Sequence, residues 1–170
     1  MRPESGKVVP VGEQNRGGFV IIQIYVEMTI RVLRFLSQQE SDTMRIASVA
    51  GRLLRCGDVV LLEGDLGTGK THFVKGVAQS KGSEANVTSP TFSIANFYKT
   101  PGCDILHIDS YRIATEDEFV NLGLQDYFPQ CIVLAEWTQK FELLFEQYLS
   151  VTLEYQEAGA KDNARAITVS

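Results

Sequence analysis

Short apolar runs alternate with segments of helical periodicity along most of the chain. The runs at 59–62 and 131–135 are wholly apolar, as in strands buried on both faces. Further strands are predicted at 29–36, 92–98, 104–109, 149–155 and 165–169, and helices at 42–54, 70–80, from 115 onward and at 138–148. Because strands and helices interleave, the pattern predicts an α/β three-layer domain, with a mainly parallel sheet and helices on both faces.

Several helix ends carry local sequence features. Ser41 or Asp42 is expected to cap the first helix, because a short side-chain oxygen satisfies an unpaired backbone N–H. Gly57 suits the left-handed turn that follows this helix. Thr115 and Glu118 form a capping box that opens the short helix.

The first 27 residues differ from the rest in composition. Two prolines and four glycines fall within 1–18, so we expect 1–27 to be a flexible extension of a domain at 28–170, with Met28 as an alternative start. The apolar run at 19–26 is too short to span a bilayer, and no cleavage site follows it. The protein is therefore expected to be soluble and cytoplasmic, without membrane association.

Composition and charge narrow the possible functions. The chain has 170 residues with 44% hydrophobic content, which suits a single domain. Its net charge of −5 argues against general binding of nucleic acid. The cysteines Cys56, Cys103 and Cys131 lie far apart and lack zinc-like spacing, so three reduced thiols are expected.

A glycine-rich segment carries the clearest functional motif. Residues 64–71, Gly-Asp-Leu-Gly-Thr-Gly-Lys-Thr, match the phosphate-binding loop G-x-x-x-x-G-K-[ST] between a predicted strand and a predicted helix. Glycines bring backbone N–H groups to phosphate oxygens, and the helix dipole favours an anion there. Lys70 supplies a charge for the β- and γ-phosphates, and the Thr71 hydroxyl is a magnesium ligand.

Two acidic residues at strand ends are candidates to complete this site. Asp109 ends the strand at 104–109, and Glu136 follows the strand at 131–135. Both would reach the carboxyl edge of a parallel sheet, where ligands bind. Either can hold magnesium, orient the attacking water or be a solvated acid, and these assignments stay open here.

Other polar residues nearby have two interpretations each. Thr91 is either a hydroxyl that senses the γ-phosphate or part of a Ser-Pro turn. His107 is more often a packed histidine than a ligand, and Trp137 is more often a packing residue. The guanine-recognition motif [NT]-K-x-D is absent, so ATP is the expected nucleotide.

Together these motifs resemble the TsaE (YjeE) family, the P-loop ATPases of bacterial threonylcarbamoyladenosine biosynthesis. The resemblance covers roughly 29–170 and rests on the motifs in their order along the chain. They are 64–71, Ser-Pro-Thr-Phe at 89–92, His-Ile-Asp-Ser-Tyr-Arg at 107–112, Leu-Gly-Leu-Gln-Asp-Tyr-Phe at 122–128, and Glu-Trp at 136–137. Thr68 and His72 replace the more usual Ala and Thr, and neither change removes a phosphate-binding group.

The resemblance implies a P-loop sheet with antiparallel additions, ATP and Mg²⁺ as cofactors, and a role for each motif residue. The implied catalytic residues are Lys70, Asp109 and Glu136; the nucleotide-binding residues are Asp65, Leu66, Gly67, Thr68, Gly69, Lys70, Thr71, Thr91, Trp137 and, less securely, Arg165; the magnesium ligands are Thr71 and Glu136.

It also implies an ATPase, weak alone, that supports assembly and turnover of the TsaD–TsaB transferase, which modifies the adenosine beside the tRNA anticodon. The chain would meet tRNA only through this complex. Two alternatives stay open. One is a non-catalytic nucleotide switch, and the other is a small-molecule kinase, which the lack of an arginine-bearing lid disfavours.

Overall fold

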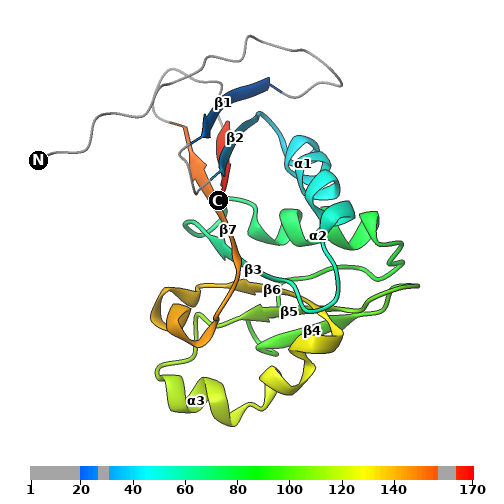
Figure 1. Ribbon diagram of the computed structural model, residues 1–170, viewed down its shortest axis with the longest axis vertical. Helices are drawn as coiled ribbons and strands as arrows, with labels where there is room; N and C mark the ends of the chain where they lie inside the picture. The colour runs from blue at the N-terminus through cyan, green and yellow to red at the C-terminus, as the bar shows by residue number, and fades with distance from the viewer. Residues whose placement is uncertain (1–19, 27–30, 157–163) are drawn as a thin grey trace, which may run out of the picture.

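The computed structural model describes residues 20–26, 31–156 and 164–170 (Figure 1). Within these residues, eight strands form one sheet: β1 (Val20–Val26), β2 (Arg31–Ser37), β3 (Val59–Glu63), β4 (Ala95–Tyr98), β5 (Ile105–Asp109), β6 (Ile132–Glu136), β7 (Leu149–Tyr155) and β8 (Arg165–Val169). The α-helices are α1 (Glu40–Leu53), α2 (Lys70–Ser80) and α3 (Glu116–Asn121), and the 3-10 helices are η1 (Leu124–Gln130), η2 (Thr138–Lys140) and η3 (Glu142–Leu144). No helix in this described part of the chain has the length and apolar character needed to cross a membrane.

The centre of the sheet is parallel and its two edges are antiparallel. The strand order is β1-β2-β8-β7-β3-β6-β5-β4. Strands β7, β3, β6 and β5 pair in parallel, whereas β1, β2 and β8 extend one edge and β4 extends the other by antiparallel pairing. The predicted α/β sheet with antiparallel additions is therefore confirmed.

Two buried clusters cover the opposite faces of the sheet. Alternate residues of a strand point to opposite faces, so Val60 and Leu62 contact one cluster and Leu61 the other. Helices α1 and α2 cover the first face, where Phe73 is fully buried, and α3 covers the second with Phe119 (Figure 1). The fold thus has the three layers that the interleaved pattern predicts.

The two predicted helix caps had different outcomes. Thr115 is confirmed as the N-cap of α3, because it accepts a hydrogen bond from the Glu118 N–H at 3.2 Å, but the Glu118 carboxylate accepts from the N–H of Ala114 at 2.9 Å and not from that of Thr115, so the capping box is half formed. Capping of the first helix by Ser41 or Asp42 is wrong, since α1 begins at Glu40 after Gln39. Asp42 instead lies inside the first turn, from which its carboxylate reaches back to the N–H of Gln38 at 3.1 Å. Gln38 precedes the N-cap residue Gln39, so this contact is not part of a capping box.

The predicted helix at 138–148 is wrong. This segment forms η2 and η3, which Phe141 separates with φ −126° and ψ 10°. Phe141 and Phe145 have the four-residue spacing of a helix face, and both are buried. They reach the core through ring contacts with Phe119 instead, so tertiary packing satisfies the apolar spacing without a continuous helix.

The observed strands also differ from the predicted ones at two places. The strand expected at 92–98 begins only at Ala95, after a turn in which Ile94 has φ +67°. Val20–Val26, within the expected extension, forms β1 antiparallel to β2. The rest of that extension, 1–19 and 27, lies outside the described residues, as does the proposed start at Met28.

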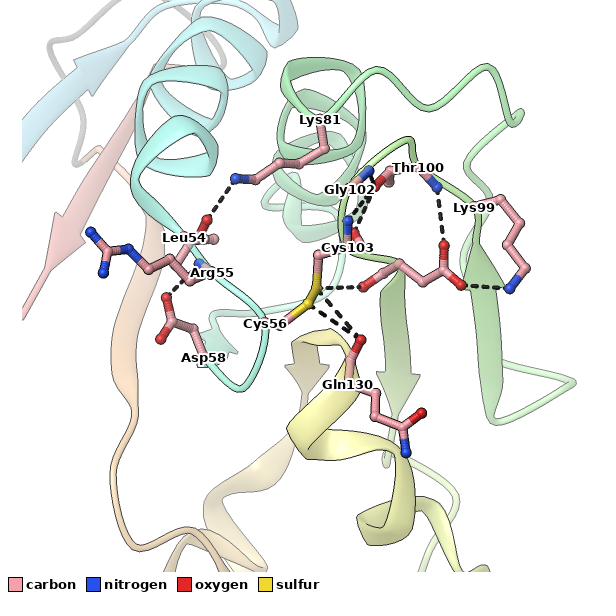
Figure 2. Close-up of a disulfide and its surroundings, with 11 residues drawn as sticks. Leu54, Arg55, Cys56, Asp58, Lys81, Lys99, Thr100, Gly102, Cys103 and Gln130 are labelled. Atoms are coloured by element: carbon pink, nitrogen blue, oxygen red, sulfur yellow. Dashed lines mark hydrogen bonds and ion pairs between the residues drawn. A yellow bond between two sulfur atoms is a disulfide. The ribbon is translucent and has the colours of Figure 1, made fainter.

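A disulfide joins Cys56 to Cys103 (Figure 2), so the expectation of three reduced thiols is wrong. The fold brings the turn after α1 against the β4–β5 hairpin, with the two Cα atoms 5.7 Å apart. The carbonyl oxygen of Gln130 lies 3.4 and 3.5 Å from the two sulfurs. Cys131 remains a buried free thiol, and burial raises its pKa above the ordinary value.

Candidate functional site

The loop at 64–71 connects the end of β3 to the start of α2, and glycines shape it. Gly64, Gly67 and Gly69 have φ of +133°, +81° and +106°, which side-chain-bearing residues rarely adopt. A Cβ at Gly64 would lie 2.2 Å from the carbonyl oxygen of Leu153, so only glycine fits there. Gly69 is the N-cap of α2 and has no side chain that could cap the helix. The N–H groups of the first turn of α2 are therefore free of a side-chain cap and are directed at the loop, as phosphate binding requires.

Lys70 is buried inside this loop. Its side-chain Nζ donates to the carbonyl oxygens of Gly64 at 2.7 Å and Asp65 at 3.0 Å, and lies 4.1 Å from the centre of the Trp137 ring. Burial lowers the pKa of this ammonium, while the nearby Glu136, Asp109 and Asp65 carboxylates raise it. The result is a poorly solvated cation, for which phosphate oxygens are better partners than loop carbonyls.

Two buried carboxylates end the strands beside the loop. Asp109 and Glu136 are the last residues of β5 and β6, directly opposite each other in parallel register, and are 4% and 3% exposed. Strand β6 also pairs with β3, which leads into the loop. The structure therefore brings together the two acids that the sequence placed at strand ends, at the carboxyl edge of the sheet.

Asp109 is held by its neighbours. Its Oδ2 accepts from the Thr91 hydroxyl at 2.7 Å, and its Oδ1 accepts from the Tyr111 N–H at 3.0 Å. Thr91, singled out in the sequence as a possible phosphate-sensing hydroxyl, thus lies against one of the two candidate acids.

The Glu136–Trp137 pair sits in an unusual backbone conformation. Trp137 has φ +61°, in the left-handed region. The buried Ser110 hydroxyl lies 2.8 Å from the carbonyl oxygens of both Glu136 and Trp137 and fixes this turn. Trp137 also packs edge-to-face against Tyr111, with ring centres 5.2 Å apart. These contacts hold the indole beside Lys70.

The remaining predicted nucleotide-binding residues surround the loop. Thr68 is buried and its hydroxyl donates to the Asp65 carbonyl at 2.9 Å, while Leu66 is 88% exposed. Thr71 is half-buried in the first turn of α2. Arg165 of β8 is buried, and its Nε lies 3.7 Å from the position of a Cβ at Gly69. The C-terminal arginine therefore lies against the loop.

Two residues at the site had no functional assignment from the sequence. His107, interpreted there as a packing residue, lies 2.9 Å from a Glu136 carboxylate oxygen through its Nε2. Tyr155 ends β7, and its hydroxyl lies 3.0 Å from the position of a Cβ at Gly67. No motif marks Tyr155, and only its place at a strand end points to it.

A cleft of about 390 Å³ opens beside the loop. Its lining comes from the ends of β3 and β7 and from the turn after β6: Glu63, Gly64, Asp65, Trp137, Gln139, Thr152, Leu153, Glu154 and Tyr155. The cleft is contiguous with the phosphate-binding loop, so it is available to the rest of a nucleotide.

The donor set fits magnesium held together with a nucleotide. Mg²⁺ prefers oxygen ligands, and the Thr71 hydroxyl and the Glu136 and Asp109 carboxylates supply them. Across the described ranges, no group of three or more His, Cys, Asp or Glu side chains is arranged to hold a metal by itself. Sites that bind Mg²⁺ through one or two protein ligands complete the shell with water and phosphate oxygens.

Comparison with known proteins gives concordant matches. Residues 37–167 match the family model described as "Threonylcarbamoyl adenosine biosynthesis protein TsaE". The tRNA threonylcarbamoyladenosine biosynthesis protein TsaE of Bacillus subtilis is 38% identical over 140 residues, covering 82% of this chain and 85% of that protein. The protein of the same name from Treponema pallidum is 35% identical over 139 residues, covering 81% and 100%. The crystal structure of Bacillus subtilis YdiB superposes with a TM-score of 0.66 at 31% identity, covering 84% of this chain and 87% of that one.

Proposed function

Because the chain belongs to the TsaE family of tRNA threonylcarbamoyladenosine biosynthesis, a P-loop nucleotide-binding family, we propose that it is the ATP-hydrolysing subunit of this modification system. In this proposal it acts in the cytoplasm with the TsaD and TsaB transferase subunits. ATP binding and hydrolysis support assembly of the complex and its resetting between rounds, while the transferase modifies the adenosine beside the anticodon.

One observation carries the nucleotide part of the proposal. A buried lysine lies within a loop of glycine-directed N–H groups, and two buried carboxylates end the strands beside it. A loop that served only as a turn would not need a desolvated ammonium whose pKa burial has lowered.

Each residue then has a definite task. The loop N–H groups bind phosphate oxygens, and the Lys70 ammonium exchanges the Gly64 and Asp65 carbonyls for the β- and γ-phosphates. Thr71 and Glu136 would hold Mg²⁺, which when bound neutralises charge on the phosphates. Asp109, fixed by Thr91, orients the attacking water and accepts its proton.

The surface beside the site supports the proposal that this chain binds a protein partner. Three large apolar side chains next to site residues are exposed: Leu66 in the loop at 88%, Phe92 after Thr91 at 92%, and Tyr111 after Asp109 at 64%. Apolar groups left in water are favourable contacts for another protein surface. Their position would let a partner respond to the nucleotide state.

Replacing Lys70 by alanine tests the nucleotide part. Loss of charged hydrogen bonds worth about 1.5–3 kcal/mol predicts at least a roughly tenfold loss of nucleotide affinity. Trp137, the single tryptophan of the chain, reports binding by fluorescence, and phosphate release reports turnover. Lys75→Ala, on the same helix but outside the loop, is the matched control and should behave as wild type.

The same variants test the coupling to modification. In a reaction reconstituted with TsaD and TsaB, Lys70→Ala should stop threonylcarbamoyladenosine formation after few turnovers. Sustained modification by this variant would show that ATP use by this chain does not drive the cycle. Unchanged nucleotide affinity would contradict the assignment of the loop.

A further inference from the structure

Three buried polar side chains cross the sheet in a line that ends at the nucleotide site. Tyr98 lies on β4, His107 on β5 and Glu136 on β6, and they are 5%, 0% and 3% exposed. Register places His107 opposite Leu134, and Glu136 two residues further along β6, so His107 and Glu136 are diagonal neighbours on one face. This is the face that α1 and α2 cover.

The proposed role of Glu136 sets the direction of the hydrogen bond between His107 and Glu136. A carboxylate that binds magnesium only accepts hydrogen bonds, so in the proposed role of Glu136 the His107 Nε2, which lies 2.9 Å from Glu136 Oε1, is the donor. This bond restrains the rotation of the carboxylate and commits one oxygen. The other oxygen, Oε2, is then left for a cation or water at the site.

The opposite end of the line anchors a loop. The Tyr98 hydroxyl donates to the carbonyl oxygen of Thr88 at 2.7 Å and accepts from the Thr88 N–H at 3.3 Å. The same oxygen faces His107 Nδ1 at 3.5 Å. Because the hydroxyl proton goes to Thr88 and Nδ1 carries no proton when Nε2 of a neutral ring donates, Tyr98 contacts the imidazole by ring packing, with the ring centres 6.1 Å apart, and links it in this way to the backbone of Thr88.

This loop also touches the second carboxylate. Thr91 follows Thr88 by three residues and donates to Asp109 at 2.7 Å. The segment from Thr88 to Thr91 is thus connected to Asp109 directly and to Glu136 through Tyr98 and His107. A shift of this segment would therefore change the positions of both the Asp109 and the Glu136 carboxylates.

We propose that His107 is a positioning residue that holds Glu136 in the orientation needed for magnesium and nucleotide, and that Tyr98 ties this orientation to the Thr88–Thr91 segment. The inference deepens the proposed function and rests on it. Removal of a group that orients a metal-binding side chain through a hydrogen bond typically lowers metal affinity or activity by about 10–100-fold. A histidine buried only for its volume would have no such effect.

Substitutions at His107 separate the two explanations. His107→Gln keeps an N–H donor that can reach Glu136, whereas His107→Leu fills a similar volume without a donor. Mg²⁺ is added stepwise to the ADP-saturated protein while Trp137 fluorescence is followed, and kcat and KM for ATP are measured separately. Nucleotide affinity without magnesium serves as the internal control.

We expect the Mg²⁺ midpoint of His107→Leu to rise about 10–100-fold, with magnesium-free ADP affinity within about twofold of wild type. His107→Gln should recover most of the wild-type midpoint, and Tyr98→Phe should fall between wild type and His107→Leu. When ATP hydrolysis is measured at a fixed, limiting Mg²⁺ concentration, His107→Leu should lower kcat by a larger factor than it changes the KM for ATP.

Equal Mg²⁺ midpoints for His107→Leu and wild type would overturn the proposal, as would a glutamine variant no better than the leucine variant. If His107→Leu does not fold, His107→Asn, whose shorter amide does not reach Glu136, replaces it in the same comparison. Because the fluorescence measurement needs no hydrolysis, a protein without ATPase activity that shows the expected midpoints would refute the proposed function and leave this inference standing.

Discussion

At the scale of single residues, the phosphate-binding loop depends on positions that accept no side chain. Gly64 is the tightest of them, since its Cβ position lies 2.2 Å from the Leu153 carbonyl oxygen and 2.9 Å from the Thr68 hydroxyl oxygen. The first contact is with the backbone of β7, which cannot move aside without disturbing its pairing with β3. The shape of the loop and the pairing of β7 with β3 therefore both require that Gly64 has no side chain.

Gly64→Ala should destabilise the protein by about 2–4 kcal/mol, because it adds an overpacked contact to a strained φ of +133°. Gly102→Ala is the matched control. Its Cβ position has no atom within 4 Å, so its effect should stay within about 0.5 kcal/mol. Urea unfolding of both variants measures the difference. Equal unfolding midpoints for Gly64→Ala and Gly102→Ala would show that the β7 backbone moves to accommodate the added Cβ.

At the scale of elements, the disulfide and the nucleotide site occupy opposite edges of the parallel strands. Cys56 and Cys103 precede β3 and β5, and Gln130 precedes β6 (Figure 2). The loop, Asp109 and Glu136 lie where these strands end. Five-residue strands separate the two edges by roughly 15 Å. The disulfide therefore acts on the packing of the β4–β5 hairpin and not directly on nucleotide contacts.

Reduction of the disulfide should lower the free energy of unfolding by about 2–4 kcal/mol, since it frees a cross-link between residues 47 apart in sequence. Urea unfolding with and without a phosphine reductant measures this loss. Nucleotide affinity should stay unchanged under the same conditions. The double variant Cys56→Ser/Cys103→Ser is the control, because the reductant should not affect it. A wild-type protein that is insensitive to reductant would contradict the prediction.

At the scale of the whole molecule, net charge and exposed apolar side chains bear on how the proposed complex would contact tRNA. The net charge of −5 disfavours contact with the tRNA phosphate backbone. The exposed Leu66, Phe92 and Tyr111 instead favour contact with protein. Both features support the proposal that this chain meets tRNA only through other subunits.

The isolated chain should bind tRNA with a Kd above about 100 μM at physiological salt, because its net charge of −5 opposes nonspecific binding to a polyanion. Addition of TsaD and TsaB together with ATP should produce a complex that binds tRNA. Anisotropy of labelled tRNA measures both, and co-purification with and without ATP shows whether this chain is in the complex. Tight, steeply salt-dependent binding by the chain alone would contradict the proposed division of tasks.

The sequence by itself determined the phosphate-binding loop, the interleaved fold and the strand-end position of both acids. These features are local, since contiguous residues set the loop and the period of apolar positions sets the strands. Other features depend on strand order, which brings distant residues together. His107 meets Glu136 across 29 residues, and Cys56 meets Cys103 across 47. The segment at 138–148 shows the same limit, because Phe141 and Phe145 have helical spacing and yet find their contacts through turns. Only the tertiary structure decided these pairings, because hydrogen bonds and packing act over a few ångströms of space, whatever the separation along the chain.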